Sequence, residues 1–272
     1  MKFIDIHGHY AWGIDDGVSS EEEAKETLKK AKENNVVALV ATPHIFSGTH
    51  TNNDIVNYKK RIQQLKIMAK NYDILIAEGC ELMLTEDTYE QVSNKLFIPF
   101  ENTTYLLCEY NVRTLSSSRS FMENFENYIY QVIDAGYKPI VAHAERYFLQ
   151  PIDLDYIQYL INLGCVIQMN TTSFLQRGNE QLYENSIALL DNNLVHVIAT
   201  DTHSSDGFRS PNLKDAYKSL VKKGYDLEYL NVMFYKNPMK ILKNEDIIIP
   251  NSKKRNVFRT LSQNIKALRI KW

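Results

Sequence analysis

The strongest constraint on the fold is the alternation of short apolar runs with longer amphipathic stretches along most of the chain. Several runs are almost continuously hydrophobic, which is typical of strands buried on both faces of a parallel sheet. Seven runs can be counted: KFIDIH, VVALVATPH, ILIAEGCE, YLLCEY, PIVAHAER, CVIQMN and VHVIATDTH. Repeated strands with helix-length connections predict a parallel sheet with right-handed crossovers, either closed as a barrel or left open.

The stretches between the runs carry apolar residues spaced by three or four, as amphipathic helices do. The clearest series are Ala24, Leu28, Ala31; Ile55, Tyr58, Ile62, Leu65, Ala69; and Phe121, Phe125, Tyr128, Val132. Ser20 precedes three glutamates, so we expect a helix to begin there with a capping box between Ser20 and Glu23.

Length and composition indicate one globular domain. The 272 residues can bury one large core, and residues 1–250 contain no linker-like segment, so we expect a single domain over 1–250. A net charge of −2 gives no basic excess that would favour nucleic acid as a partner. The three cysteines lie in apolar runs, and there is neither a signal peptide nor a long apolar stretch. We therefore expect reduced thiols and a cytoplasmic location.

The last residues, 251–272, form a basic tail with seven Lys or Arg and no acidic residue, whereas residues 1–250 have 24 basic against 33 acidic residues. Phe258, Leu261, Ile265 and Leu268 recur at helical spacing, which predicts a basic amphipathic helix. Two interpretations stay open. The helix packs on the domain with its basic side in solvent, or it contacts an acidic partner or the anionic inner face of the membrane.

Most histidines and several acidic residues lie where the apolar runs end. These residues are His7, His9, His44, Glu81, Glu109, His143, Asp201 and His203. Because the carboxyl ends of parallel strands meet on one face, we expect these side chains to cluster. A single histidine at a strand end is more often an ordinary polar residue, but five of the seven histidines lie there. Imidazole and carboxylate are the usual ligands of zinc, manganese and iron, so the pattern predicts a metal site.

Two arginines follow the predicted ligands closely. Arg146 comes three residues after His143, and Arg209 comes six residues after His203. They could form ordinary surface salt bridges. Arginine also suits bidentate contact with phosphate oxygens, so two arginines beside a metal cluster favour a phosphate ester as substrate.

The sequence argues against a phosphatase that uses a cysteine nucleophile. Such an enzyme needs the pattern Cys-x5-Arg. The residues six positions after Cys80, Cys108 and Cys165 are Glu86, Thr114 and Thr171. A metal-dependent hydrolysis needs no protein nucleophile.

In their order, the segments DIHGH with GIDDG, then ATPH, GCE, CEY, AHAERY and ATDTHSSDGFR resemble the motifs of the PHP (polymerase and histidinol phosphatase) metallo-phosphoesterases. Within them the chain resembles the bacterial capsular and exopolysaccharide tyrosine-protein phosphatases, from Met1 to about residue 245. The resemblance implies an α/β fold, a distorted seven-stranded (β/α)7 TIM-like barrel. It also implies three divalent metal ions, for which we expect manganese, with iron and zinc as alternatives.

The resemblance further implies a role for each site residue. One ion would be held by His7, His9, Glu81 and Asp201. A second ion would be held by Glu81, Glu109 and His143. A third ion would be held by Asp16, His44 and His203. Asp16 rather than Asp15 matches the family position. Arg146 and Arg209 match the arginines that bind the phosphate in family members. In those enzymes a metal-bridging hydroxide attacks the phosphorus.

The implied activity is that of a protein-tyrosine phosphatase, a phosphoric monoester hydrolase acting on a bacterial tyrosine kinase that controls capsule or exopolysaccharide synthesis. Two alternatives are a small-molecule phosphatase of the histidinol-phosphate type and a non-catalytic metal-binding regulator; assembly as a homo-oligomer also stays open. Four aromatic residues near the motifs are expected either to contact the tyrosine ring of the substrate or to pack within loops. They are Tyr10, Trp12, Phe46 and Tyr147.

Overall fold

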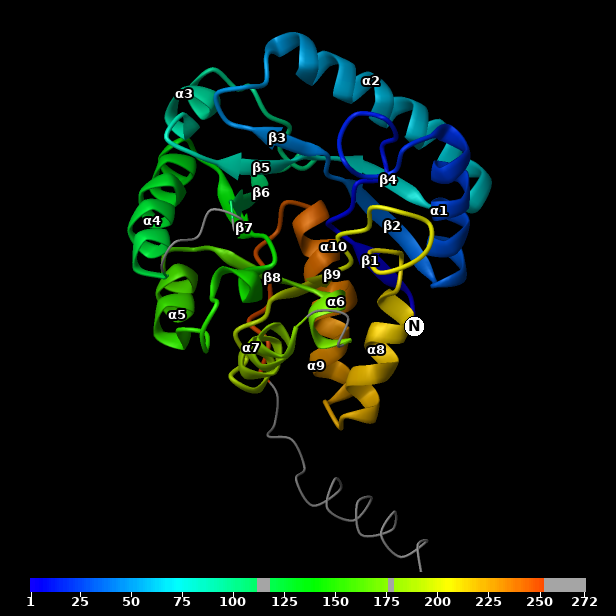
Figure 1. The fold of residues 1–272 in the computed structure, drawn as a ribbon. Helices are drawn as coiled ribbons and strands as arrows, with labels where there is room; N and C mark the ends of the chain where they lie inside the picture. The colour runs from blue at the N-terminus through cyan, green and yellow to red at the C-terminus, as the bar shows by residue number, and fades with distance from the viewer. Residues whose placement is uncertain (112–117, 176–178, 252–272) are drawn as a thin grey trace, which may run out of the picture.

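A computed structural model describes residues 1–111, 118–175 and 179–251 of the chain. The fold is α/β: the strands lie inside and the longer helices surround them (Figure 1). The helix predicted within the basic tail falls on residues 252–272, outside the described residues. Among those described, no helix is long and apolar enough to cross a membrane.

The described residues contain nine strands in two parallel sheets. The first sheet contains β1 (Phe3–Asp5), β2 (Val36–Ala41) and β4 (Leu75–Glu78) in that order. The second contains, in order, β3 (His44–Phe46), β5 (Glu81–Leu84), β6 (Tyr105–Tyr110), β7 (Lys138–Val141), β8 (Val166–Asn170) and β9 (Val197–Ala199). Each of the seven apolar runs contains at least one strand, so the predicted parallel arrangement is confirmed.

Nine strands arise from seven runs because two runs are each divided. VVALVATPH contains β2 and, after Thr42 and Pro43, the first residue of β3; proline has no N–H to donate to a strand ladder. ILIAEGCE contains β4 and, after Gly79 and Cys80, the first residue of β5. A Cβ atom at Gly79 would lie 2.7 Å from Val40 Cγ1 and 2.8 Å from the Phe100 ring, so this crossing needs glycine.

The first and last strands meet at their carboxyl ends. Gly8 and Thr202 form an isolated parallel bridge, in which the His9 N–H donates to the Thr202 carbonyl at 2.7 Å. Just before it, the buried carboxylate of Asp5 accepts a hydrogen bond from the Thr200 N–H at 3.1 Å. We call this junction the seam. It brings residues nearly 200 positions apart in the sequence into contact.

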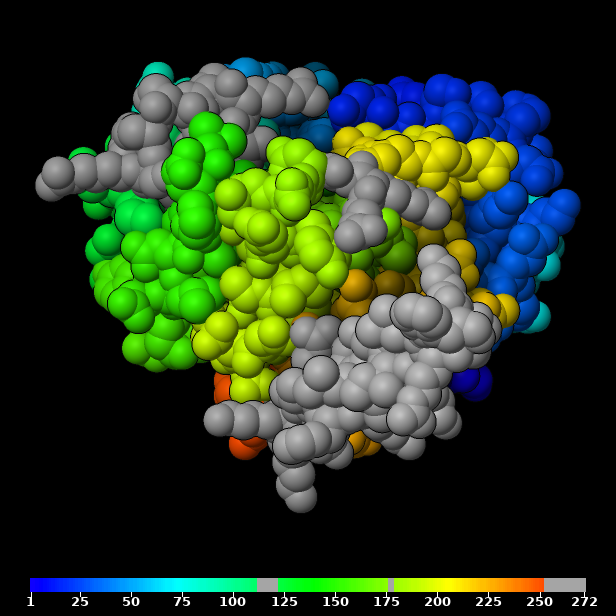
Figure 2. Space-filling model, turned by 60° about the horizontal axis from the view of Figure 1, so that its bottom comes forward, coloured from blue at the N-terminus to red at the C-terminus, as the bar shows by residue number. Residues whose placement is uncertain are grey.

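The helices follow the strands in the predicted alternation. They are α1 (Glu21–Glu33), α2 (Asn52–Ala69), α3 (Thr88–Ser93), α4 (Ser118–Asp134), α5 (Leu154–Asn162), α6 (Thr171–Phe174), α7 (Glu180–Asp191), α8 (Leu213–Lys222), α9 (Leu227–Asn231) and α10 (Asn237–Leu242). Figure 2 shows the N-terminal part in blue on one flank, and the green region that contains α4 and α5 on the other.

The predicted helix faces are buried in α1 and α2. The predicted capping box at the start of α1 is only half correct. Ser20 Oγ accepts a hydrogen bond from the Glu23 N–H at 3.2 Å, but the Glu23 carboxylate accepts from Ser19 instead of Ser20. A complete box stands at the start of α2, between Thr51 and Asp54.

Two apolar clusters fill the molecule. The larger one packs the helices against the outer faces of the strands. The smaller one contains alternate residues of several strands, as expected for side chains pointing to a common interior. Its members include Ile4 and Ile6, Ala38 and Val40, Tyr105 and Leu107, Ile140 and Ala142, and Val197 and Ala199. Ile241 of α10 joins this inner cluster, which leaves the carboxyl ends of the strands to polar residues.

Candidate metal centre

The residues predicted as metal ligands come together at the carboxyl ends of the strands. His7 and His9 follow β1, His44 and Glu81 follow β2 and β4 and begin the short strands β3 and β5, Glu109 lies near the end of β6, His143 follows β7, Asp201 and His203 follow β9, and Asp16 lies in the loop before α1. His44 and Glu81 are direct partners in the register of β3 and β5. Parallel strands thus bring together residues spread over most of the sequence.

Glu81 lies at the middle of the cluster and is almost fully buried. Its Oε2 is 3.1 Å from His7 Nε2, 3.3 Å from His9 Nε2 and 3.1 Å from His44 Nδ1. Its Oε1 is 3.0 Å from His143 Nε2. Four imidazoles therefore surround one carboxylate, an arrangement suited to a carboxylate that bridges metal ions.

Three groups of ligand atoms lie close enough together to hold an ion, with the atoms of each group within 4.8 Å of one another. The groups are His7, His9, Glu81 and Asp201; His9, Asp16, His44 and His203; and His44, Glu81 and Glu109. His143, expected with the last group, has its Nε2 3.4 Å from Glu109 Oε1. The groups overlap closely with the ligand sets that the family resemblance implies, with His9 and His44 each shared between two groups.

The hydrogen bonds of three histidines leave one ring nitrogen of each available for a metal. Nδ1 of His7 lies 2.9 Å from Gln168 Oε1, that of His9 lies 2.6 Å from an Asp15 oxygen, and that of His203 lies 3.0 Å from the Asp201 carbonyl. These partners accept, so Nδ1 carries the proton and Nε2 has the lone pair. Within the described residues, all three buried Nε2 atoms lack a hydrogen-bond partner. The donor set fits divalent metal ions.

The ionisation of two site residues, Asp201 and His203, supports the same assignment. Burial alone would raise the pKa of Asp201, but His7 and Arg209 outweigh burial and hold that pKa well below its usual value. Burial lowers the pKa of His203 to about 2. The site therefore presents an ionised carboxylate and a neutral imidazole, which are the forms that bind metals.

Both predicted arginines border the cluster and contact Asp201. An Arg146 guanidinium nitrogen lies 3.1 Å from Asp201 Oδ2. Arg209 pairs with Asp201 Oδ1 and donates from Nε to the Asp201 carbonyl at 3.2 Å. Their side chains are 21% and 26% exposed, so each reaches solvent at the edge of the site.

A second layer of residues, not predicted from the sequence, supports the candidate ligands. Asp15 accepts hydrogen bonds from His9 Nδ1 and from the His44 N–H, so it orients two candidate ligands. Gln168 accepts a hydrogen bond from His7 Nδ1 and donates one to Asn170. Asn170 in turn donates a hydrogen bond to Asp201 at 2.8 Å. Gln168 and Asn170 end the run CVIQMN, to which no ligand was assigned. Two polar residues at alternate positions of a buried strand were the available signal.

Three of the four aromatic residues expected near the substrate are buried. The Tyr10 hydroxyl donates to Asp5, the Tyr147 hydroxyl accepts from the Tyr110 N–H, and the Trp12 ring lies under the Arg61 guanidinium at 4.5 Å. These three pack within the fold. Phe46 alone of the four is exposed, to 39%, with its ring 5.6 Å from that of His44.

A cavity of about 450 Å³ opens beside the cluster. It is lined by Ile14, Asp15, Asp16, His44, Phe46, His50, Tyr58, Met83, Glu109 and Asn111. Candidate ligands and apolar side chains thus share one space, which is large enough for an aromatic ring and its neighbouring groups.

A sequence model of the family described as capsular polysaccharide synthesis, CpsB/CapC, matches residues 3–243. This chain belongs to the CpsB/CapC family. Among the relatives, CapC of Staphylococcus aureus is 32% identical over 90% of this chain and 92% of its own length. The tyrosine-protein phosphatase CpsB of Streptococcus agalactiae is 29% identical over 90% of this chain and 100% of its own.

Solved structures support the fold of this CpsB/CapC member. A structure from a study of YwqE from Bacillus subtilis and CpsB from Streptococcus pneumoniae, called metal-dependent tyrosine phosphatases there, matches with a TM-score of 0.71. It is 22% identical and covers 93% of this chain and 100% of the other. A histidinol phosphate phosphatase from Lactococcus lactis matches with a TM-score of 0.54 at 15% identity, covering 82% of this chain and 93% of its own. At these identities the likeness concerns the fold.

Proposed function

We propose that this CpsB/CapC member is a metal-dependent protein-tyrosine phosphatase. The observation that carries the proposal is the set of three buried Nε2 lone pairs of His7, His9 and His203, converging on Glu81, Asp16 and Asp201. The names of the relatives supply the substrate class, phosphotyrosine. The family description favours a protein of capsule synthesis as substrate, and we propose a bacterial tyrosine kinase.

The proposed centre contains three divalent ions, with manganese expected and iron or zinc as alternatives. The proposed ligands are the nine residues given above, from His7 to His203. We propose that the seven runs form the strands of a distorted seven-stranded barrel, which positions these ligands. When bound, divalent ions supply Lewis acidity, which activates water and offsets charge on phosphoryl oxygens. Asp15 and Gln168 orient the imidazoles that hold them.

Arg146 and Arg209 are proposed to bind the phosphoryl group. Each guanidinium lies at the solvent edge of the cluster, where its donors can face phosphate oxygens. The leaving group is a phenolate, whose ordinary pKa of about 10 makes it easier to expel than an aliphatic alkoxide. The protein therefore contributes charge and orientation, and no protein side chain attacks the phosphorus.

The location and partners follow from the same proposal. We place the enzyme in the cytoplasm, where its three buried cysteines, all free, would stay reduced. A kinase is the expected partner, and nucleic acid is not. The other two functions considered from the sequence, a histidinol-phosphate-type phosphatase and a non-catalytic regulator, predict different results in the experiment below.

The test is metal analysis of protein purified without chelator, combined with turnover of a phosphotyrosine peptide and of histidinol phosphate on the same sample. We expect bound divalent metal and peptide turnover that a chelator abolishes. Turnover of histidinol phosphate without peptide turnover would favour the small-molecule phosphatase. Metal without turnover of either substrate would favour the regulator.

Phe46 is expected to determine affinity for the tyrosine ring. The substitution Phe46→Ala should raise KM for a phosphotyrosine peptide about fivefold with little change in kcat, because an aromatic contact of this kind is worth about 1 kcal/mol in both ground and transition states. Steady-state kinetics measure both constants. The control is Leu75→Ala, an equally simple loss of an exposed apolar side chain at the opposite end of the strands. An unchanged KM in Phe46→Ala would exclude this role.

A further inference from the structure

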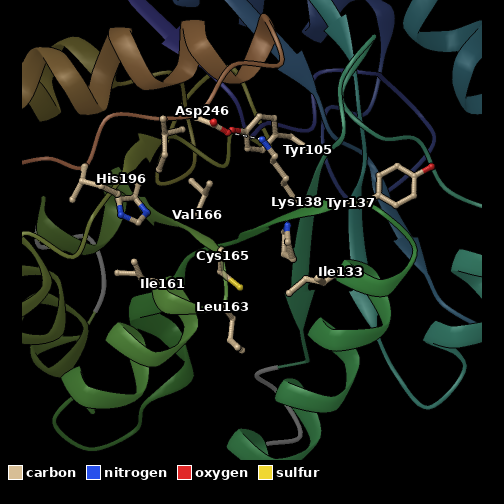
Figure 3. A pocket seen from close by; sticks show the side chains of 14 residues that line it. Tyr105, Ile133, Tyr137, Lys138, Ile161, Leu163, Cys165, Val166, His196 and Asp246 are labelled. Atoms are coloured by element: carbon tan, nitrogen blue, oxygen red, sulfur yellow. Dashed lines mark hydrogen bonds and ion pairs between the residues drawn. The ribbon is translucent and has the colours of Figure 1, made fainter.

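A second cavity, of about 360 Å³, lies at the end of the molecule opposite the metal centre. Its walls include Tyr105, Lys138 and Val166, the first residues of β6, β7 and β8. The candidate ligands lie at the other ends of the strands. Figure 3 shows apolar side chains, among them Ile161, lining this space below the ion pair of Lys138 and Asp246.

One polar group in this cavity lacks a partner. His196 lines the cavity and is 1% exposed. Its Nδ1 accepts a hydrogen bond from the Ile167 N–H at 3.0 Å, so the ring proton lies on Nε2. Burial lowers the pKa of His196 to about 4, which keeps the ring neutral at physiological pH. In the described part of the chain Nε2 has no acceptor, so an occupant of the cavity is expected to offer an oxygen as well as apolar surface.

The chain itself leads from this cavity to the basic tail. Ile247 and Ile249 form part of the wall, and Ile249 is still 62% exposed. The described chain ends at residue 251, two positions later, and 21 more residues follow. Their apolar series continues to the last residue, because Trp272 follows Leu268 by four. The tail therefore starts beside the cavity, and its apolar stripe is suited to contact the apolar side chains of the cavity wall.

Charge and tethering favour the tail over a separate molecule. The tail has seven basic and no acidic residues, whereas residues 1–250 have nine more acidic than basic residues. A segment joined by a short linker experiences an effective concentration of about millimolar, so even a weak apolar contact is substantially occupied. Six residues separate Asn251 from Phe258, enough chain to fold back onto the adjoining wall.

We propose that the apolar stripe of the tail, from Phe258 to Trp272, packs into this cavity of the same molecule. A backbone or side-chain oxygen of the tail accepts the His196 Nε2 hydrogen bond. The basic side of the tail then faces solvent at the end of the domain opposite the metal centre. This inference concerns an interaction surface and does not depend on the proposed phosphatase activity.

Hydrogen–deuterium exchange of the full chain tests the proposal. The double variant Phe258→Asp with Leu261→Asp puts two charges on the apolar stripe. The matched control, Asn256→Asp with Gln263→Asp, puts the same two charges on the opposite side of the predicted helix. We expect the amides of 161–168 and 245–251 to exchange about tenfold faster in the first variant and at the wild-type rate in the control, because docking protects the cavity walls.

Two results would overturn the inference. The first is equal exchange of the walls in wild type, test variant and control, which would show that the tail does not cover the cavity. The second is protection of the cavity-wall amides only under conditions in which sedimentation velocity detects a dimer. This result would show that the cavity is filled by a second copy of the chain. Phosphatase turnover, measured alongside, is expected to stay unchanged in both variants.

Discussion

Replacing Glu81 by glutamine is expected to reduce turnover of a phosphotyrosine peptide by about a thousandfold or more, a loss of about 4 kcal/mol of transition-state stabilisation. The Glu81 carboxylate faces four imidazoles at 3.0 to 3.3 Å, so among the residues that the structure describes no other joins as many candidate ligands. Glutamine keeps the shape of the side chain, but its neutral amide cannot bridge cations as a carboxylate does. Metal content per chain should fall with activity.

Glu90→Gln is the matched control, because Glu90 is exposed on α3 and outside the cluster. Circular dichroism distinguishes loss of the site from loss of the fold. Full turnover by folded Glu81→Gln, with an undiminished metal content, would remove Glu81 from the proposed centre.

Loss of an arginine proposed to bind phosphate should have the next largest effect. Arg146→Ala is expected to lower kcat/KM about a hundredfold or more, or about 3 kcal/mol, because its guanidinium would stabilise charge that develops on the phosphoryl oxygens. Arg146→Lys should recover only part of this, since an ammonium group cannot make the two parallel hydrogen bonds of a guanidinium. Calorimetry with inorganic phosphate should show weaker binding in both variants.

Arg61→Ala serves as the control, because Arg61 stacks on Trp12 and makes no contact with Asp201. This variant should lose some stability and bind phosphate normally. If Arg146→Ala binds phosphate as tightly as wild type and keeps its turnover, Arg146 contributes only its ion pair with Asp201.

Much of the site could be predicted because parallel strands convert sequence position into spatial position. His44, Glu81 and His143 are far apart in the sequence, yet each lies at or near the end of an apolar run. Once the runs are recognised as parallel strands, their carboxyl ends must lie on one face. No long-range information beyond the β/α alternation was needed to group these residues.

Other features depended on contacts that one sequence cannot reveal. Asp15 and Asp16 are adjacent and chemically identical, and only the loop conformation directs Asp15 inward to His9 and Asp16 outward to His44 and His203. The separation of β4 from β5 depends on how closely Gly79 approaches Val40. Trp12 is covered by a helix residue, Arg61, whose approach is set by tertiary packing.

The seam between β1 and β9 has a consequence for how the protein is made. His7 and His9 are synthesised first, but the residues that complete their group, Asp201 and His203, are added almost 200 residues later. A nascent chain still on the ribosome holds only part of the two groups that contain Asp201 and His203 until the last strand has emerged and docked beside the first. Completion of these two proposed metal sites is therefore a late step of biogenesis, and a chain truncated before residue 201 should retain less metal than the full chain even where its early strands have formed.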